Sequence, residues 1–554
     1  MSTEKVNIGV LINDMIVQQW ILKTIDNLSR SEYAEVSLII TRDQDAEAKK
    51  SNRKYGGINP VKIYEALDRT FFRRLHDYHS LKDLSELSTD VTVYNLVAGS
   101  SGSVPVEKKK ELINQIKPDL IILFGRHQLE EEIFSIPRYG VWRFSVDTSA
   151  EPGELDFGYR EVIHHLPLTE TIIEQVRGQG NSIDTIYRSR ESTYRFSVNI
   201  NRNKSYYRAT MVLPRLVEGL ARFGEDYLAA LKDRHTKAVV GDKLPVDSHD
   251  SGDWRALWSH LAKLLLLGFN KLIYTDAFSW YLLIDLDNEG MGRLNNFSSY
   301  RFIKRPPHKF WADPFVVVSD HKYFLFVEEF IYRKNRAHIA FLELDDEGRY
   351  LRSGKVLEKP YHMSYPFTFK IGDTYYMIPE TSQNRTIELY KCTDFPDKWE
   401  FVMNLMEDVT ATDTTPFYHE NKWWLFTTID STNGISGCST ELYLFYSDDI
   451  FSGQWISHPL NPVVADESNA RCAGKLYFRD GAIFRPSQDC SVRYGRGINI
   501  NRVTRLNTLE YSEIREFDIR PDWNRKLKGI HTLNSDGDMK VVDVYSFHNR
   551  FSLI

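Results

Sequence analysis

The amino-acid sequence predicts two domains of different architecture: an α/β domain followed by an all-β domain built as a five-bladed β-propeller. The length of 554 residues exceeds that of an ordinary single domain. The first part of the chain combines apolar, strand-like runs with helical spacing, whereas the second part repeats one aromatic hairpin five times. Aromatic residues are also placed unevenly, since nine of the eleven tryptophans follow residue 250.

Near-continuous apolar runs identify the α/β domain, which we expect over residues 1–231. Residues 6–12, 35–41 and 118–124 have the composition of buried strands, and residues 14–30 carry apolar side chains at helical spacing. Strands that are apolar on both faces are typical of a parallel sheet covered by helices. The first strand is not followed by a GxGxxG turn, which disfavours dinucleotide binding.

Residues 232–275 are expected to connect the two domains. Residues 232–253 are polar and fit a linker, and residues 254–274 have the pattern of an amphipathic helix. Two interpretations of this helix remain open. It can pack between the domains, or it can make a peripheral membrane contact, because lysine and arginine flank a leucine-rich face that bears tryptophan.

Five similar hairpins occupy residues 276–554 and predict the propeller. Each has a strand, a short polar turn and a second strand that is usually aromatic, with turns at residues 320, 372, 420, 480 and 536. The separations of 52, 48, 60 and 56 residues fit four-stranded blades. We expect residues 280–286 to close the ring and wide aromatic side chains to fill the space between blades.

Charge and cysteine usage exclude several classes of protein. The chain has 70 basic and 76 acidic residues, a net charge of −6, whereas nucleic-acid binding requires a basic excess. No apolar leader, no run of 18 apolar residues and no CxxC pair among the four cysteines is present. We therefore expect a cytoplasmic protein without a metal site, in which residues 254–274 are the one candidate for a peripheral membrane contact.

Polar residues stand where the hairpins are expected to meet a central channel. The first strands begin with Asp313, Asp413, Arg471 and His531, and the second strands end near Glu329, Glu380 and Asp489. Carboxylates from several blades that converge on one axis repel each other, and this raises the pKa of at least one of them. The alternative is that these acids cap strands or pair with arginines such as Arg333, Arg385, Arg471 and Arg485.

Paired carboxyl groups in such a channel suit glycosyl transfer, which needs two of them beside the anomeric carbon. We assign Asp313 as base or nucleophile and Glu380 as acid, with Glu329 as an equal candidate for the acid. Asp413 would tune a neighbouring pKa. The expected substrate-binding residues, which would stack on sugar rings, clamp a phosphate or line the channel, are Trp311, Tyr365, Arg385, Arg471, Asp489 and His531.

The first domain resembles a known fold. The order of NIGVLI, KPDLIILFGRHQL, GVWRFSVD, EVIHHLPLTETIIEQ and IYRS is similar to the formyltransferase fold of methionyl-tRNA, glycinamide-ribonucleotide and sugar-nucleotide N-formyltransferases, over residues 5–225. The resemblance implies an Asn, a His and an Asp that bind and polarise the formyl group of 10-formyltetrahydrofolate.

This chain departs from that pattern at each of the three positions. Arg143 stands at the Asn position, Ser145 at the His position and Asn181 at the Asp position. Ser and Asn do not titrate near neutral pH, as a general acid or base must. The resemblance therefore implies a catalytically degenerate domain without a cofactor. A shifted alignment would instead place Asp147, His164 or His165 there and restore 10-formyltetrahydrofolate as cofactor.

The second domain resembles two groups of proteins. WADPF, at Trp311–Phe315, looks like the first-blade motif of five-bladed glycoside hydrolases of the arabinanase, invertase and mannoside-phosphorylase groups. The segments FWADPF, YHMSYPF, PETSQNRTIELY, NKWWLFTT, HPLNPVV, RPSQDCSVRYG and GIHTLN resemble a domain shared by bacterial formyltransferase-like fusions and the N-terminal region of plant glucosamine inositolphosphorylceramide transferases.

Three classes of function follow. The first is a carbohydrate-active enzyme of surface-glycan or glycolipid assembly, with chemistry in the propeller and a carbohydrate or sugar nucleotide as substrate. The second is a sugar-nucleotide N-formyltransferase that uses 10-formyltetrahydrofolate and binds glycan through its propeller. The third is a non-catalytic glycan-binding scaffold.

Overall fold

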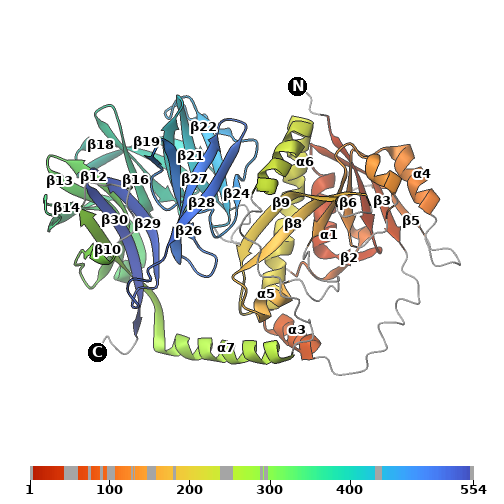
Figure 1. Ribbon diagram of the computed structural model, residues 1–554, viewed down its shortest axis with the longest axis horizontal. Coiled ribbons are helices and arrows are strands. Elements are labelled where there is room, and N and C mark those ends of the chain that lie inside the picture. The colour runs from red at the N-terminus through yellow and green to blue at the C-terminus, as the bar shows by residue number, and fades with distance from the viewer. Residues whose placement is uncertain are drawn as a thin grey trace. The chain divides into compact units, whose positions relative to one another are not determined.

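The computed structural model describes residues 4–42, 60–72, 77–87, 91–96, 106–125, 129, 131–145, 158–178, 182–237, 254–286, 291, 297–430 and 439–549 (Figure 1). The chain divides into two compact units. The first comprises Met1–Ser189 and Thr193–Ala262, and the second comprises Arg190–Ser192 and Lys263–Ile554. The division falls within helix α7 (Trp254–Ile273), inside the segment that the sequence suggested as a connection.

The first unit is built on a seven-stranded sheet in the order β5-β3-β1-β6-β7-β8-β9. β5, β3, β1, β6 and β7 run parallel, and β8 is antiparallel to β7. The apolar runs of the sequence form the centre of this sheet, since β1 and β6 are almost wholly buried. The strands are β1 (Val6–Ile12), β3 (Ala34–Arg42), β5 (Val93–Leu96), β6 (Leu120–Phe124), β7 (Val141–Ser145), β8 (Leu168–Arg177) and β9 (Ser182–Ser192), with a separate ribbon of β2 (Ile16–Gln18) and β4 (Leu81–Asp83).

Helices complete the first unit. They are α1 (Gln19–Ser29), α3 (Pro60–Phe71), α4 (Val106–Ile116), α5 (Tyr159–Ile163), α6 (Val198–Lys237) and the first part of α7. The long helix α6 packs on α1, where the rings of Trp20 and Tyr206 stack with their centroids 5.2 Å apart. It is interrupted at Gly224, whose φ of 64° lies in the left-handed region that glycine tolerates. Among the described residues, no helix has the length and apolar character needed to cross a bilayer.

The second unit consists of five antiparallel sheets, which confirms the predicted five-bladed propeller (Figure 1). The hairpins expected at residues 320, 372, 420, 480 and 536 each join two neighbouring strands. In order along the chain, the blades are β12 (Lys309–Ser319), β13 (Lys322–Ile331), β14 (Arg336–Leu344) and β15 (Tyr350–Leu357); β16 (Ser364–Ile371), β17 (Thr374–Thr381), β18 (Thr386–Asp394) and β19 (Lys398–Glu407); β20 (Ala411–His419), β21 (Lys422–Ile429), β22 (Glu441–Ser447), β23 (Ile456–Ser457) and β24 (Val464–Ala465); and β25 (Tyr477–Arg479), β26 (Ala482–Asp489), β27 (Gly497–Leu506) and β28 (Tyr511–Ile519).

The fifth blade joins the two ends of the unit. It pairs β10 (Tyr274–Leu286) and β11 (Arg301–Phe302) from the start of the unit with β29 (Gly529–Asp536) and β30 (Met539–Asn549) from its end. β10 lies antiparallel to β30, with Trp280 opposite Tyr545. The ring closure expected from residues 280–286 is therefore confirmed.

The first strand of most blades carries an irregularity at the same place. The pairing register shifts after Ala312, Ser364, Thr412 and Ile530, which are equivalent positions in four blades. The residues that follow in three of them, Asp313, Tyr365 and Asp413, have φ angles of 50°, 43° and 50°. Such bulges re-aim side chains. A positive φ in a residue as bulky as tyrosine persists only where its surroundings hold it, so these positions are candidates for function.

Candidate functional site

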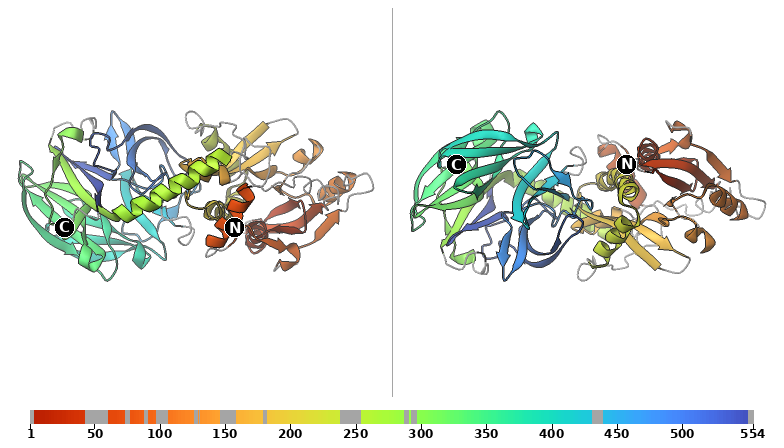
Figure 2. Two further views of the ribbon diagram at one scale, coloured as in Figure 1. Left: turned by 90° about the horizontal axis from the view of Figure 1, so that it is seen from below. Right: turned by 90° about the horizontal axis from the view of Figure 1, so that it is seen from above.

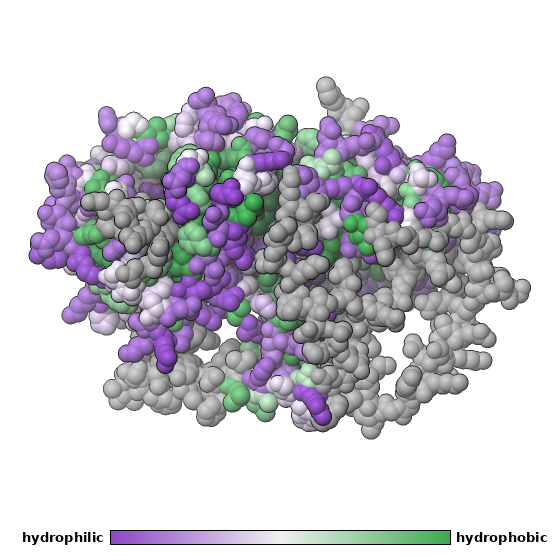
Figure 3. Space-filling view, in the orientation of Figure 1, coloured by the Kyte–Doolittle hydropathy of each residue, from purple (hydrophilic) through white to green (hydrophobic). Residues whose placement is uncertain are grey.

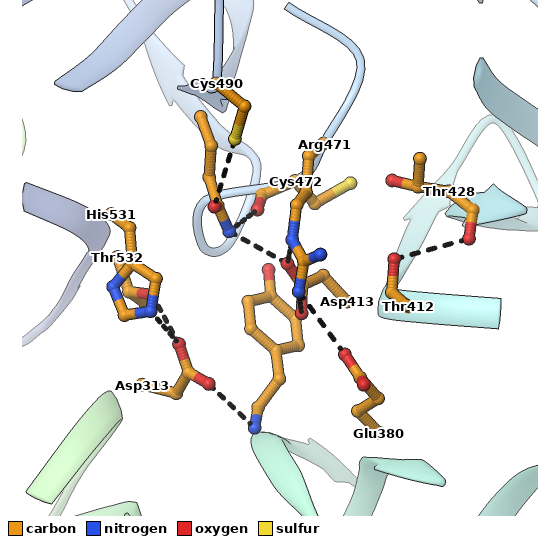
Figure 4. Close-up of polar contacts among 12 residues, drawn as sticks. Asp313, Glu380, Thr412, Asp413, Thr428, Arg471, Cys472, Cys490, His531 and Thr532 are labelled. Carbon is orange, nitrogen blue, oxygen red and sulfur yellow. Dashed lines mark hydrogen bonds and ion pairs between the residues drawn. The ribbon is translucent and has the colours of Figure 1, made fainter. Parts of the chain in front are cut away.

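Polar side chains from all five blades meet at these bulges, and Figure 4 shows several of the hydrogen bonds and ion pairs among them. The Tyr365 N–H donates to Asp313 Oδ2 over 3.2 Å, which links the β12 and β16 blades. The Tyr365 hydroxyl lies 2.9 Å from Thr415 Oγ1 in β20 and accepts a 2.9 Å hydrogen bond from the Gly474 N–H. The Thr532 hydroxyl in β29 donates to Asp313 Oδ1 over 2.8 Å. We call the ionisable residues here the central cluster: Asp313, Glu380, Asp413, Arg471, His531 and Asp543, together with Glu328, whose carboxyl interacts electrostatically with the four acids.

His531 joins two carboxylates of the central cluster. Its Nδ1 lies 2.7 Å from Asp543 Oδ2, and its Nε2 lies 3.3 Å from Asp313 Oδ1. The ring is buried and stacks on Trp280 with the centroids 3.9 Å apart. Burial alone would lower the pKa of His531, but the neighbouring carboxylates of Asp543 and Asp313 outweigh burial and raise it. The geometry therefore favours an imidazolium between two acids.

Asp543 accepts hydrogen bonds from the backbone of the bulges in β12 and β29. Its carboxylate is fully buried and accepts the N–H groups of Asp313 and Thr532, both over 2.8 Å, and of His531 over 3.3 Å. A bulge leaves backbone donors without ladder partners, and a buried donor must be satisfied. Asp543 thus fixes the two strands that position Asp313 and His531.

Arg471 lies between two acids on the other side of the cluster. Its Nε–H donates to Asp413 Oδ2 over 2.7 Å, and its Nη2 lies 3.4 Å from Asp413 Oδ1 and 3.6 Å from Glu380 Oε2. The Gln488 side-chain amide donates to Asp413 Oδ2 over 2.8 Å. Burial opposes the guanidinium charge, but Asp413 and Glu380 help to keep the pKa of Arg471 above its usual value. Figure 4 shows the Arg471 side chain reaching toward both acids.

Glu328 is a member of the cluster that the sequence did not single out. It lies on β13, is 9% exposed, and among the described residues its carboxyl makes no hydrogen bond. Its nearest ionic partner is His362, whose Nε2 is 3.5 Å from Glu328 Oε1. Burial raises the pKa of Glu328 well above its ordinary value, and the charges of Asp313, Glu380, Asp543 and Asp413 raise it further. A carboxyl in this environment is protonated more readily than an ordinary glutamate.

Glu329, the next residue, has the opposite environment. Successive side chains of a strand point to opposite faces, and Glu329 meets Trp311 Nε1 at 2.8 Å, Lys309 Nζ at 2.6 Å and His338 Nε2 at 3.3 Å. Although burial raises the pKa of Glu329, these donors lower it to about 2. Glu329 is therefore ionised at neutral pH, outside the central cluster. Trp311, which it binds, is buried in the blade packing and offers no open ring face for a sugar.

The stability that Glu329 contributes should depend on pH. Because its folded pKa lies below that of an unfolded glutamate, the contribution is complete above about pH 4.5 and is lost as the pH falls toward 2. We expect Glu329→Gln to lower the free energy of unfolding at pH 6.5 and to lower it less at pH 3.5, as measured by urea denaturation. The exposed Glu400 supplies the control, since Glu400→Gln should change little at either pH. An equal loss at both pH values for Glu329→Gln would contradict this origin of its stability.

Some of the other site residues predicted from the sequence lie in or beside the central cluster, and others lie elsewhere in the propeller. The structure brings together Asp313, Glu380, Asp413, Arg471, His531 and the buried Tyr365. Arg385 is exposed and donates to the Asp408 carbonyl over 3.0 Å. Asp489 is buried against Arg496 at 3.1 Å and Arg520 at 2.7 Å, so its charge is neutralised locally.

Of the three formyl-transfer positions of the first unit, the structure describes Arg143 and Ser145. Arg143 lies in β7 and donates from Nε to Glu174 Oε2 over 2.9 Å, so its guanidinium is engaged within the sheet. Ser145 is the last residue of β7. Asn181 and Asp147 lie outside the described residues.

Comparisons with known proteins match parts of the chain. Residues 302–547 match the family described as glucosamine inositolphosphorylceramide transferase 1, N-terminal. Glucosamine inositolphosphorylceramide transferase 1 of Oryza sativa subsp. japonica is 33% identical over 211 residues, which are 38% of this chain and 28% of the relative. The chain thus spans little more than a quarter of the length of the curated relative it matches.

Two solved structures align with different parts of the chain. A family 117 glycoside hydrolase of Zobellia galactanivorans aligns with 49% of this chain and 90% of its own, at 10% identity and a TM-score of 0.32. Phosphoribosylglycinamide formyltransferase of Coxiella burnetii aligns with 40% of this chain and 88% of its own, at 14% identity and a TM-score of 0.27.

Proposed function

We propose that the propeller is the catalytic unit of an enzyme that transfers or hydrolyses a glycosyl group in the assembly of a surface glycan or glycolipid. The match of residues 302–547 to the N-terminal region of a transferase named for glucosamine and inositolphosphorylceramide supports a carbohydrate substrate. The first unit would then be a degenerate formyltransferase-like domain, which the engagement of Arg143 by Glu174 supports.

The observation that carries this proposal is the difference between the environments of Asp313 and Glu328. Burial raises the pKa of Asp313, but the His531 ring and hydrogen bonds from the Tyr365 N–H and the Thr532 hydroxyl stabilise its ionised form. Among the described residues, Glu328 contacts the His362 ring at 3.5 Å, and its pKa is raised well above the ordinary value by burial and then by the charge of Asp313. Glycosyl transfer requires one ionised and one protonated carboxyl, and environments that differ in this way supply them.

The roles follow from these environments. Asp313 acts as the base or nucleophile, and Glu328 donates the proton to the leaving-group oxygen. Glu380 and Asp413 share Arg471, so they fit the task of orienting sugar hydroxyls. Arg471 is already bound by these two acids, which leaves little of its charge for a phosphate.

The charge balance of the central cluster favours a cationic sugar. It contains five carboxyl groups but two basic groups, Arg471 and His531. A substrate with a protonated amine would offset the excess negative charge, whereas a neutral sugar would not. The name of the relatives includes glucosamine, which is an amino sugar.

The test is the activity of Glu328→Gln on methyl glycosides, 4-nitrophenyl glycosides and nucleotide sugars of glucosamine, N-acetylglucosamine and glucose. We expect the native protein to prefer the glucosamine compounds and the variant to lose about 10²–10⁴ in kcat/KM on the methyl glycosides, the usual contribution of a general acid. The loss should be smaller for the 4-nitrophenyl glycosides and nucleotide sugars, whose leaving groups need no proton.

Glu329→Gln is the matched control, because it changes the adjacent residue by the same atoms outside the cluster. It should keep its activity. Full activity of Glu328→Gln would contradict the assignment of the acid. A melting temperature that rises with 10-formyltetrahydrofolate and with none of the sugars would contradict the proposed function.

A further inference from the structure

Helix α3 in the first unit exposes its apolar side. Ile63, Leu67 and Phe71 lie at a spacing of four residues and are 49%, 52% and 79% exposed. On the other side of the helix, the acids Glu65 and Asp68 are 7% and 5% exposed. A surface helix ordinarily buries its apolar stripe and exposes its charges. The orientation of α3 is therefore the reverse of the ordinary one.

The buried acids hold α3 in this orientation. Glu65 Oε1 lies 2.8 Å from Arg202 Nη1 on α6, and both side chains are almost fully buried. Asp68 Oδ2 accepts the Asn199 N–H over 2.7 Å at the start of α6. Turning α3 to bury its apolar stripe would leave Arg202 without this carboxylate and the end of α6 without its acceptor. The contacts of the buried acids with α6 therefore keep the apolar stripe of α3 exposed.

The neighbouring helix α7 also exposes apolar side chains. Its Leu257 and His260 are buried, and the Tyr64 hydroxyl of α3 lies 3.3 Å from His260 Nε2, so the two helices touch. Trp258 is 64% exposed, and further along the helix Leu265 and Leu266 are exposed as well. The view from below in Figure 2 shows α3 and the first turns of α7 on the near side of the unit. We call Ile63, Leu67, Phe71 and Trp258 the two-helix face.

The charges on these helices indicate what covers the two-helix face. Residues 254–273 contain Arg255, Lys263 and Lys271 and no acid. The two acids of α3 are buried on its far side, and its Arg69 is exposed. An apolar strip with tryptophan, on helices whose exposed charges among the described residues are basic, has the composition of a helix that lies in the headgroup region of an anionic bilayer. In contrast, the face of the propeller seen in Figure 3 is mostly hydrophilic.

We propose that the two-helix face docks on an anionic lipid surface. The side chains of Ile63, Leu67, Phe71 and Trp258 enter the boundary between headgroups and acyl chains, and Arg255 and Lys263 of α7 meet the lipid phosphates. Apolar burial supplies most of the affinity, and the basic residues supply selectivity for anionic lipid. This inference does not depend on the chemistry of the propeller.

The experiment measures co-sedimentation of the full chain with vesicles of phosphatidylcholine alone and of phosphatidylcholine with 30% phosphatidylglycerol. We expect binding to the anionic vesicles, weakened by added salt, and binding at least tenfold weaker to the neutral ones. The variant with Leu67→Ser, Phe71→Ser and Trp258→Ser should bind at least tenfold more weakly. The single change Lys263→Gln should weaken binding to the anionic vesicles about fivefold.

A matched control removes three equally exposed apolar side chains from the propeller: Phe478→Ser, Leu509→Ser and Ile514→Ser. It should bind vesicles as the native protein does, and circular dichroism should be unchanged in both triple variants because all six positions are exposed. Equal vesicle binding by the two triple variants would overturn the proposal. So would an absence of vesicle binding, or a native dimer that dissociates only in the first triple variant, which would assign the face to a second copy of the chain.

Discussion

Replacing Arg471 by methionine is expected to lower the free energy of unfolding of the propeller by about 3–5 kcal/mol. Arg471 contacts Asp413 at 2.7 Å and Glu380 at 3.6 Å, and all three side chains are almost fully buried. Methionine fills similar space without charge, so the two acids would face each other and the rest of the cluster without a counter-ion. Removing one partner of a buried pair costs more than the pair itself contributes, because the remaining charge stays buried.

Urea denaturation followed by tryptophan fluorescence measures this change, since seven of the eleven tryptophans lie in the propeller unit. A second variant separates charge from packing. Arg471→Met combined with Asp413→Asn removes one of the two stranded carboxylates and keeps a residue that tolerates the φ of 50°. It should recover part of the lost stability, as a double-mutant cycle would show. A loss below about 1 kcal/mol for Arg471→Met, or no recovery in the double variant, would contradict this account of the cluster.

Asp543→Leu is expected to destabilise the propeller by at least about 3 kcal/mol. The Asp543 carboxylate accepts the N–H groups of Asp313, His531 and Thr532 and lies 2.7 Å from the His531 ring. Leucine accepts no hydrogen bond, and each buried donor left without a partner costs about 1–3 kcal/mol. The same denaturation experiment measures the loss, and the activity should fall as well because the bulge positions Asp313.

Two other substitutions serve as comparisons for Asp543→Leu. Asp543→Asn keeps one oxygen and should cost less than Asp543→Leu. Asp373→Leu, in the fully exposed hairpin turn of the β16 blade, makes the same chemical change without touching a buried donor and should stay within about 0.5 kcal/mol of the native protein. If Asp543→Leu were as stable as Asp373→Leu, Asp543 would not be the acceptor that holds the bulge.

The architecture of the propeller could be predicted because each hairpin turn is determined by residues that are neighbours in the sequence. Turn residues at the hairpin tips and a spacing near 55 residues follow from chemistry within a few positions of each tip. The five hairpins and the closing strand therefore appear where the sequence places them. The strands of the first unit could be predicted for the same reason, because each is a continuous apolar run in the sequence. Residues 6–12 and 118–124 match β1 and β6.

The choice between Glu328 and Glu329 could not be made in this way. The bulge between Ala312 and Phe315 inserts one extra residue in β12 opposite β13. β13 itself pairs with β14 without a register shift, so alternation places Glu328 and Glu329 on opposite faces of the blade. Alternation does not tell which face meets the other acids, because packing against blades distant in the sequence sets that. A useful signal was nevertheless present at Asp543, because a single acid inside the apolar run KVVDVYSF is costly unless it has buried donors to accept.

The orientation of α3 was also beyond local reasoning. Its apolar spacing alone predicts a helix with Ile63, Leu67 and Phe71 facing inward. The orientation of α3 is set instead by Arg202 and Asn199, more than 130 residues away in the sequence. They bind the acids on the opposite side of the helix. The periodicity of apolar residues within a helix does not reveal ion pairs of this kind, which join residues distant in the sequence.

The closure of the ring by β10 and β30 has a consequence for synthesis. β10 leaves the ribosome before the other strands of the propeller, and its partner β30 is the last strand to appear. Until Met539–Asn549 emerges, β10 has no long partner and the nascent blades have two open ends. Unpaired strand edges are prone to join other chains. Chaperone dependence should therefore fall abruptly once this final strand is released, and a stalled ribosome just before it should yield the most aggregation-prone intermediate.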